Sequence, residues 1–332
     1  MPQVDVAEIG ESTAPYDGDE GGGEEHEYEP GHRPWTVPPG VPDRGCDPDG
    51  TWTGTLPPMG GMTVRVVRGT GWTLIWLGLL SLAFVAYQLW GTGLLTGVEQ
   101  TAGSASLERR FGDLREEPLP ALALSIDADG SVDESVLTPR NGPVISESAP
   151  AQGEALAVIT FPTLRRGGSP MPTGDVELED LLVGAERHVV WSGEDLRTLR
   201  KGPGHYLDTP LPGQPGNASI AGHRTTYGAP FNRLGELRPG DPIVVETTIG
   251  RHVYVVRDPR TVHDRVDDGQ VGQTGGWFVV PPSATWVVGD LRGGWLTLTT
   301  CHPLFSSRQR LIVVAELVEG PNAGAVETAG GG

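Results

Sequence analysis

A long stretch without charged residues lies in the first third of the chain, from Gly69 to Val98. Its central part is rich in Leu, and Trp72 and Trp90 lie near its two ends. About 20 apolar residues of helix cross the hydrocarbon core of a bilayer, and tryptophan is enriched at the membrane interfaces. The pattern therefore predicts one transmembrane helix over residues 69–95. A buried core helix is the alternative, but the sequence shows no companion helix of similar character.

The segments on either side of this helix lack sustained apolar periodicity. Residues 1–68 are rich in Pro, Gly, Glu and Asp, and such a segment cannot bury enough apolar surface to offset the entropy lost on ordering. We predict a disordered acidic tail there. Residues 96–153 are expected to form a short charged helix and then a linker that holds the next domain away from the bilayer.

Beyond residue 154, apolar and polar residues alternate over short segments, a pattern typical of β-strands with one buried face. The predicted strands span residues 155–161, 188–191, 243–247, 252–256, 285–288, 296–300 and 311–318. About seven or eight short strands with little helix favour a closed or nearly closed β-barrel, a mainly β fold. The barrel is expected over residues 154–320, and residues 321–332 are expected to be a flexible tail.

Charge is distributed unevenly along the chain, whose net charge is −19. A nucleic-acid partner would require clustered Lys and Arg, so the composition argues against one. Arg65 and Arg68 precede the predicted helix and Glu99 follows it. The positive-inside rule then places the amino terminus in the cytoplasm and the large domain outside the cell. Arg109 and Arg110 oppose this orientation weakly, because they lie farther from the membrane.

The chain contains two cysteines, Cys46 and Cys301. In the predicted topology they lie on opposite sides of the membrane and cannot form a disulfide. Cys301 ends the strand pattern that starts at Trp295, and Arg310 opens the next apolar run. The two side chains can meet across neighbouring strands, where the guanidinium would favour the thiolate. A buried structural cysteine is the alternative interpretation.

His223 is the best candidate for a partner of Cys301. It follows a short apolar strand and Gly222, so the imidazole is expected at a strand end in a polar loop. His302 is expected on the opposite face of the strand from Cys301, because successive side chains alternate. Three other histidines are expected at the surface: His205, His252 and His263.

Arg308 competes with Arg310 for the role of electrophile. Arg310 shares the alternation of the strand that follows it, whereas Arg308 lies in a polar loop, so we favour Arg310. The sequence shows neither a Gly-rich phosphate loop with Lys nor a His-Glu-x-x-His or Cys-x-x-Cys motif. We therefore expect no metal and no cofactor, and we interpret Asp267 and Asp268 as part of a solvated loop.

These motifs together resemble the sortase family. The sequence Thr-Leu-Thr-Thr-Cys ends at Cys301, Arg310 follows nine residues later, and Gly-His-Arg around His223 lies upstream. Two further stretches, Gly-Pro-Gly-His-Tyr ending at Tyr206 and Tyr-Gly-Ala-Pro-Phe beginning at Tyr227, are similar in particular to class E sortases of actinobacteria. The resemblance covers about residues 154–320 and departs at Leu304, where many class E members have a basic residue.

The resemblance implies an eight-stranded sortase-type β-barrel with short helices and cysteine transpeptidation. Cys301 would attack the Thr carbonyl of a Leu-Ala/Pro-x-Thr-Gly sorting signal, and an amine of a peptidoglycan precursor or a pilin would resolve the acyl-enzyme. His223 would act as acid and base, and Arg310 would hold the oxyanion. Thr300 and Tyr227 are expected to contact the substrate, although strand propensity explains Thr300 equally well.

Two other classes of protein remain open. A hydrolytic cysteine peptidase of another fold would usually carry its cysteine at a helix start with the histidine downstream, which is the reverse of the order here. A non-enzymatic membrane-anchored β-domain that binds peptide or cell wall would use Cys301 structurally. In that case the thiol would stay inert to a labelling reagent.

Overall fold

The computed structural model describes residues 61–114, 122–137, 142–165 and 171–325. The chain divides into two compact units, Met1–Val64 and Arg65–Gly332. Only the beginning of the first helix is described in the first unit. The acidic tail and most of the carboxy-terminal tail predicted above therefore lie outside the described residues.

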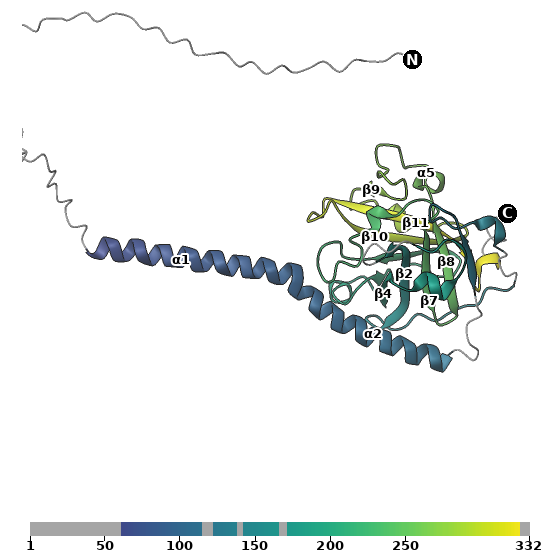
Figure 1. Ribbon diagram of the computed structural model, residues 1–332, viewed down its shortest axis with the longest axis horizontal. Helices are drawn as coiled ribbons and strands as arrows, with labels where there is room; N and C mark the ends of the chain where they lie inside the picture. Colours follow the sequence, from purple (N-terminus) through teal and green to yellow (C-terminus); the bar gives the residue numbers. More distant parts are fainter. Residues whose placement is uncertain (1–60, 115–121, 138–141, 166–170, 326–332) are drawn as a thin grey trace, which may run out of the picture. The chain divides into compact units, whose positions relative to one another are not determined.

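The described residues begin with a long helical run (Figure 1). The helix α1 (Gly61–Ala86) is followed by a π-helical turn (Tyr87–Gly91) and by α2 (Thr92–Leu114). Large apolar side chains of α1 are exposed along its length. Within the described residues, the run 61–112 is the one helix long and apolar enough to cross a membrane. The transmembrane helix predicted over residues 69–95 falls within it.

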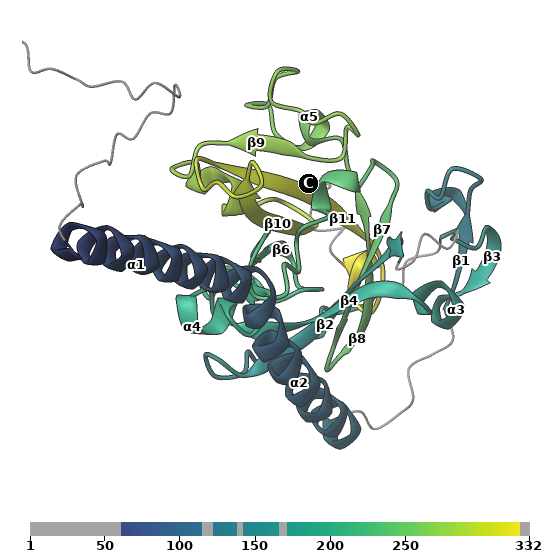
Figure 2. The same ribbon diagram turned by 60° about the vertical axis from the view of Figure 1, so that its left-hand side comes forward.

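A β-barrel follows the helices. Its strands are β2 (Ala155–Arg165), β4 (Ala185–Ser192), β5 (Gly204–His205), β6 (Gly216–Ala221), β7 (Pro242–Thr247), β8 (Gly250–Val256), β10 (Gly294–His302) and β11 (Gln309–Glu319). They pair in the order β10-β6-β5-β4-β2-β7-β8-β11, and β10 also pairs with β11, which closes the ring (Figure 2). The strand β9 (Phe278–Val280) is added to β11 outside the ring. The predicted eight-stranded barrel is confirmed.

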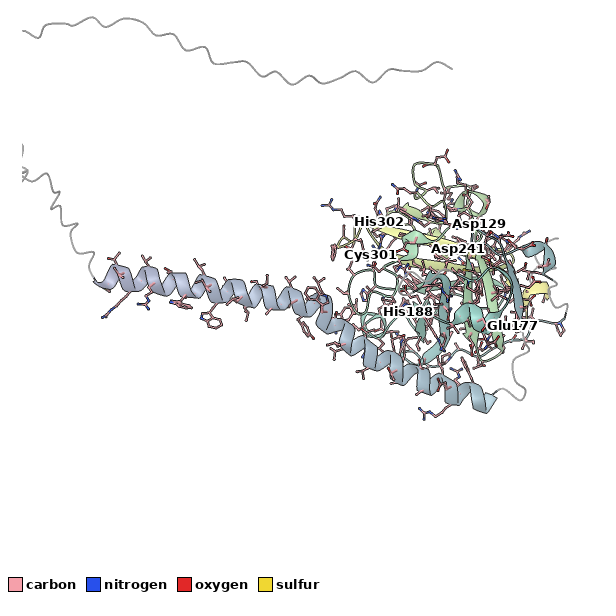
Figure 3. All side chains as sticks on the ribbon, in the orientation of Figure 1. Asp129, Glu177, His188, Asp241, Cys301 and His302 are labelled. Atoms are coloured by element: carbon pink, nitrogen blue, oxygen red, sulfur yellow. The ribbon has the colours of Figure 1, made fainter. Side chains whose placement is uncertain are left out.

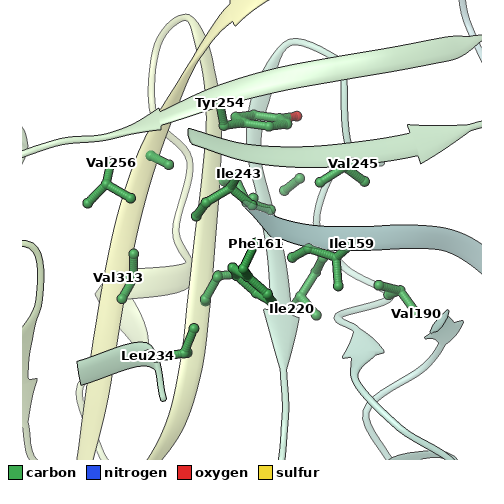
Figure 4. Close-up of a cluster of buried hydrophobic side chains, with 14 of the residues drawn as sticks. Ile159, Phe161, Val190, Ile220, Leu234, Ile243, Val245, Tyr254, Val256 and Val313 are labelled. Atoms are coloured by element: carbon green, nitrogen blue, oxygen red, sulfur yellow. The ribbon is translucent and has the colours of Figure 1, made fainter. Parts of the chain in front are cut away.

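The barrel core is built from the inward-facing residues of these alternating strands. Leu296 and Leu298 of β10 and Val313 of β11 are fully buried in it. Figure 4 shows part of this core, including Val313 and Tyr254. The phenol oxygen of Tyr254 accepts a hydrogen bond from the backbone N–H of Gly213 at 2.6 Å. The one polar atom of this side chain is thus satisfied, and burial raises the pKa of Tyr254.

A small two-stranded sheet packs on the outside of β7 and β8. It consists of β1 (Ala123–Ile126) and β3 (Gly174–Glu177), which run antiparallel, and β3 leads directly into α3 (Leu178–Leu182). Leu124 and Ile126 are buried in a cluster with outward-facing valines of β7 and β8. The segment predicted as a linker is therefore partly structured, because its short apolar stretch covers this apolar outer face.

One predicted strand is wrong. Residues Thr285–Val288 form a 3₁₀ helix, which ends at Gly289. Their apolar side chains pack outside the barrel, with Val287 buried in a cluster that includes Ile312 and Val314 of β11. The apolar side chains of this run are thus buried by packing on a sheet, and the run does not pair with a neighbouring strand.

The surface positions predicted for three histidines are also wrong, since His205, His252 and His263 are all buried. Each ring has a specific neighbour. The Nε2 of His205 lies 2.8 Å from the Pro210 carbonyl oxygen, and the Nε2 of His252 lies 3.1 Å from the Thr247 hydroxyl. His263 packs against aromatic rings. Burial lowers the pKa of His205 and His263, so the neutral ring is favoured in both.

Candidate active site

The strand order brings the predicted cysteine and histidine to one rim of the barrel. The strands β6 and β10 run parallel, with Ala221 opposite Thr299. Parallel neighbours that run in register reach the same edge of a sheet. Two residues beyond this pair lie His223, just after β6, and Cys301, still on β10. Neighbouring strands therefore deliver both side chains to the same rim.

The next strand brings Arg310 to this rim as well. In the antiparallel pairing of β10 and β11, Cys301 lies directly opposite Arg310. Directly paired residues project to the same face of a sheet. Their neighbours Thr300 and Leu311 are buried, so Cys301 and Arg310 lie on the outer face at the rim. Arg308, the competing arginine, is exposed in the loop before β11.

Cys301 is half-buried and is a free cysteine, at one end of the barrel together with His302 (Figure 3). Thr300 directly before it is buried, and its hydroxyl donates a hydrogen bond of 2.7 Å to the backbone carbonyl of Gly222. This bond joins the strand of the cysteine to the residue before His223. A substrate contact by Thr300 stays a prediction, because the hydroxyl is engaged within the domain.

The imidazole of His223 packs against the ring of Tyr227, with ring centroids 4.9 Å apart and planes inclined by 38°. Burial lowers the pKa of His223, and the positive charge of Arg200 lowers it further. The guanidinium carbon of Arg200 lies 5.8 Å from the centre of the Tyr227 ring. The neutral imidazole is therefore favoured near pH 7, which is the form that accepts a proton.

Gly222 is required for a close approach of another side chain. A Cβ atom at this position would lie 2.5 Å from Cδ2 of Phe231, nearer than such atoms approach in proteins. Phe231 is fully buried and packs edge to face with Phe161, with centroids 6.2 Å apart. The position of the loop that begins with His223 thus depends on a core aromatic ring lying directly on the glycine.

Arg224 contacts the cysteine strand, a role that the sequence analysis missed. Its Nη1 donates to the backbone carbonyl of Cys301 at 3.3 Å and lies 2.6 Å from Nδ1 of His302. Burial lowers the pKa of Arg224, whereas its interaction with Cys301 raises it. The only signal in the sequence was its position next to His223. The ring of His302 is thus engaged with a guanidinium and with Trp277, 5.6 Å away.

The guanidinium of Arg310 is held by its own loop. Its Nη1 donates to the carbonyl oxygens of Ser307 and Gln309 at 3.0 Å and 3.1 Å. Both bonds use Nη1, so the N–H groups of Nε and Nη2 take no part in these two contacts. An arginine oriented in this way can donate hydrogen bonds to a developing oxyanion.

The acidic pair in the β8–β9 connection is held within its own loop. The Oδ1 of Asp267 accepts the N–H of Gly269 at 3.0 Å, and Asp268 pairs with Arg260 at 2.6 Å. Across the described residues, no group of three or more His, Cys, Asp and Glu side chains could hold a metal ion.

The barrel agrees with the comparisons to known proteins. The family model described as "Sortase domain" matches residues 182–318, which include His223, Cys301 and Arg310. Together with the relatives described next, this match identifies the chain as a member of the sortase family.

Two curated relatives come from Streptomyces coelicolor. Sortase SrtE1 is 30% identical over 269 residues, which cover 78% of this chain and 59% of the relative. Sortase SrtE2 is 26% identical over 266 residues, which cover 78% of this chain and 85% of the relative. A solved structure of sortase E1 from the same organism has a tripeptide in the active site and is 30% identical to this chain. The match covers 52% of this chain and 99% of that structure, with a TM-score of 0.36. The class E resemblance seen in the sequence agrees with the names of the two curated relatives.

Proposed function

We propose that this protein is a membrane-anchored cysteine transpeptidase that cleaves a Leu-Ala/Pro-x-Thr-Gly sorting signal between Thr and Gly. The acyl group would pass to an amine of the cell wall or of a pilin. The observation that carries the proposal is the strand register at one rim, where Cys301 lies opposite Arg310 and the parallel neighbour of its strand leads to His223.

In the proposed reaction, the neutral imidazole of His223 takes the proton of the Cys301 thiol. The resulting thiolate attacks the Thr carbonyl carbon, and the electrons of the carbonyl move to its oxygen. Arg310 stabilises this oxyanion by hydrogen bonding, a role whose loss typically costs about 10² to 10³ in rate. The tetrahedral intermediate collapses to a thioester as the C–N bond to Gly breaks. His223 gives a proton to the departing Gly amine.

The second half of the reaction restores the thiol. An acceptor amine attacks the thioester, His223 removes its proton, and the Cys301 thiolate leaves as the new amide bond forms. His223 then returns this proton to the thiolate, which regenerates the thiol and the neutral imidazole. We further propose that Tyr227, whose ring packs against the imidazole of His223, contacts the substrate near the scissile bond. We also propose a preference for Ala at the second motif position, which the resemblance of the sequence to class E sortases suggests.

The long apolar helix supports a membrane anchor. In the proposed orientation, the amino terminus lies in the cytoplasm and the barrel lies outside the cell, because Arg65 and Arg68 precede the apolar stretch and Glu99 follows it. Reporter domains fused to either end test this orientation, and an amino terminus that is active only when exported would contradict it.

The experiment that tests the function uses the full chain in detergent micelles with a Leu-Ala-x-Thr-Gly peptide and an amine acceptor. We expect Cys301→Ala, His223→Ala and Arg310→Ala each to abolish product formation. Arg308→Ala serves as the matched control, because this arginine lies in the same loop outside β11, and it should retain most of the activity. An equal loss at Arg308 would overturn the role given to Arg310.

The second candidate function is a non-enzymatic peptide- or wall-binding domain with a structural Cys301. The half-buried state of the thiol favours the enzyme. Labelling with a thiol reagent followed by peptide mapping, which distinguishes Cys301 from Cys46, separates the two. A structural cysteine would stay unmodified in the folded protein.

A further inference from the structure

The first turns of α2 carry polar side chains on the face that meets the barrel. Thr92, Thr96 and Gln100 follow at intervals of four residues and therefore share one face of the helix. Thr92 is 3% and Thr96 is 5% exposed, whereas Leu94 and Leu95 are mainly exposed. The buried face is thus the hydroxyl-bearing one, although burial of apolar surface alone would select the other. The polar contacts made by this face explain the choice.

Thr92 contacts the loop that carries His223. Its hydroxyl donates to the carbonyl of Gln88 at 2.8 Å and accepts the backbone N–H of Tyr227 at 3.2 Å. Tyr227 has a φ of 52°, in the left-handed region that bulky residues rarely adopt unless their surroundings hold them there. The same tyrosine packs against the imidazole of His223. Thr92 therefore holds the backbone of Tyr227, and the ring of Tyr227 packs against the catalytic His223.

Thr96 contacts the other neighbour of this loop. Its hydroxyl donates to the backbone carbonyl of Arg200 at 2.9 Å. A Cβ atom added at Gly228, next to Tyr227, would lie 3.4 Å from the Thr96 methyl group, so the loop runs close to this threonine. The guanidinium of Arg200 in turn lies over the Tyr227 ring. Thr92 therefore holds the residue that packs on His223, and Thr96 holds the residue whose charge lowers the pKa of His223.

The rest of α2 anchors these two contacts to the barrel. The side chain of Gln100 donates to the carbonyls of Val189 and Lys201 and accepts the N–H of Val189. Farther along, Leu107 and Phe111 are buried against β2 and β4. These hydrogen bonds and the apolar burial together fix the helix on the barrel. They therefore also fix the positions of Thr92 and Thr96 against the loop.

We propose that α2 belongs to the catalytic apparatus, because Thr92 and Thr96 hold the His223 loop in its working conformation. The helix that continues from the membrane anchor would thus position the histidine of the reaction. This inference rests on the proposed transpeptidase function. Both threonines are positioning residues, since they act through Tyr227 and Arg200.

The charged and titratable groups on this rim come from the loop of His223 itself and from elements other than α2. They are Arg200 after α4 (Leu196–Leu199), Tyr227 and Arg224 in its own loop, Cys301 and His302 on β10, and Arg310 on β11. The α2 residues in contact with the loop are uncharged. A substitution at Thr92 or Thr96 therefore changes the protonation of His223 only by moving the loop or Arg200.

The test uses the full chain in detergent micelles and two readouts. Exchange of the imidazole C2 proton, followed by mass spectrometry, reports the pKa of His223 without requiring activity. In Thr92→Val and Thr96→Val we expect this pKa to rise, because burial and the charge of Arg200 both lower it in the native loop. We also expect kcat for peptide transfer to fall by about 10-fold with a smaller change in KM, since misplacement by about 1 Å can cost about 10²-fold.

Two variants make the result specific. Thr92→Ser keeps the hydroxyl and should restore both readouts. Thr101→Val on the same helix is the matched control, because Thr101 is exposed and bonds only along the helix to Gly97; it should behave as the native chain. If Thr92→Val and Thr96→Val match this control in both readouts, the inference is overturned.

The outcomes also separate this inference from the proposed function. An inactive Cys301→Ala together with unchanged threonine variants removes the role of α2 and keeps the transpeptidase. An active Cys301→Ala removes the transpeptidase mechanism, and the pKa of His223 then still shows whether α2 holds the loop. Should Thr92→Val fail to fold, the measurements on Thr96→Val decide.

Discussion

A single glycine illustrates how strictly the site depends on packing at the residue scale. Gly222→Ala would place a methyl group 2.5 Å from the buried ring of Phe231. Because neither the ring nor the strand can move freely, we expect the variant to lose about 1–3 kcal/mol of unfolding free energy and most of its peptide-transfer activity. Urea denaturation and a peptide assay measure the two effects.

Gly235→Ala is the control for this prediction, since its added methyl would meet side chains at 3.6 Å or more, an ordinary contact distance. It should leave both quantities near the native values. Equal behaviour of the two alanine variants would show that contact with Phe231 does not determine the position of His223.

The charge of Arg200 gives a second residue-scale prediction. Its positive charge disfavours the imidazolium form and so lowers the pKa of His223. In Arg200→Gln this pKa should rise, and the acid limb of the kcat/KM profile should move to higher pH. Arg197→Gln is the control, because this arginine lies on α4, just before Arg200, and its side chain is 91% exposed. An acid limb that does not move in Arg200→Gln would contradict the prediction.

The sequence predicts the principal candidates of the site but not their supporting contacts. Cys301, His223 and Arg310 stand out because each lies at a strand end and because the motifs resemble a known family. Arg224 could not be assigned from the sequence, since its contact with the Cys301 carbonyl depends on the parallel pairing of β6 and β10. Tyr227 is expected at the site from the resemblance, but its packing on His223 and its positive φ of 52° could not be predicted from the sequence.

At the scale of elements, two glycines of α2 test how the helix docks. A Cβ atom at Gly103 would lie 2.8 Å from the Trp191 ring, whereas one at Gly97 would have nothing within 4 Å. Replacement of Gly by Ala inside a helix typically stabilises it by about 1 kcal/mol. We therefore expect Gly97→Ala to be neutral or stabilising and Gly103→Ala to lower the melting temperature. A higher melting temperature in both would show that α2 does not pack closely on β4.

A strand predicted from its apolar composition is wrong where the apolar side chains are buried without strand pairing. The run Thr285–Val288 has strand-like composition but forms a 3₁₀ helix that packs outside the barrel. The short strand β1 escaped prediction because its apolar stretch is brief and its partner β3 lies about 50 residues away in sequence. Long alternating segments such as β10 and β11 were predictable, because their period of two persists.

At the scale of the whole molecule, Asp241 gives the folded state an unusual pH dependence. Burial raises its pKa from 3.8 to about 6, so between these values the folded state binds more protons than the unfolded one. Stability should therefore fall as pH rises through this window, by about 3 kcal/mol for the full shift. The buried His205 and His263 act in the opposite sense near and below pH 6.5, because their pKa values are lowered.

Comparison with Asp241→Asn isolates the contribution of this carboxyl group. The amide keeps an acceptor for the N–H of Arg238, which bonds Asp241 at 2.9 Å, and it does not titrate. Relative to the native chain, the variant should gain stability between about pH 4 and about pH 7. A stability difference that stays constant across this range would contradict the assignment of a raised pKa.

The closed ring of eight strands could be predicted as a class, because many short alternating segments with little helix have few other compact arrangements. The resemblance to sortases supplied the number of strands. The packing of the first turns of α2 on the barrel could not be predicted, since Thr92 and Thr96 are buried there and Leu94 and Leu95 are exposed, the reverse of the pattern on which such predictions depend.

The central claim is that Cys301 is the nucleophile of an acyl transfer, and the most direct test is to trap the acyl-enzyme. The full chain is incubated with a Leu-Ala-x-Thr-Gly peptide without an added amine, quenched in acid, and mapped by mass spectrometry. We predict a thioester that carries the peptide up to Thr on Cys301, its loss on addition of an amine, and its absence in Cys301→Ala. An intact peptide with unmodified Cys301, or an adduct on another residue, would contradict the account.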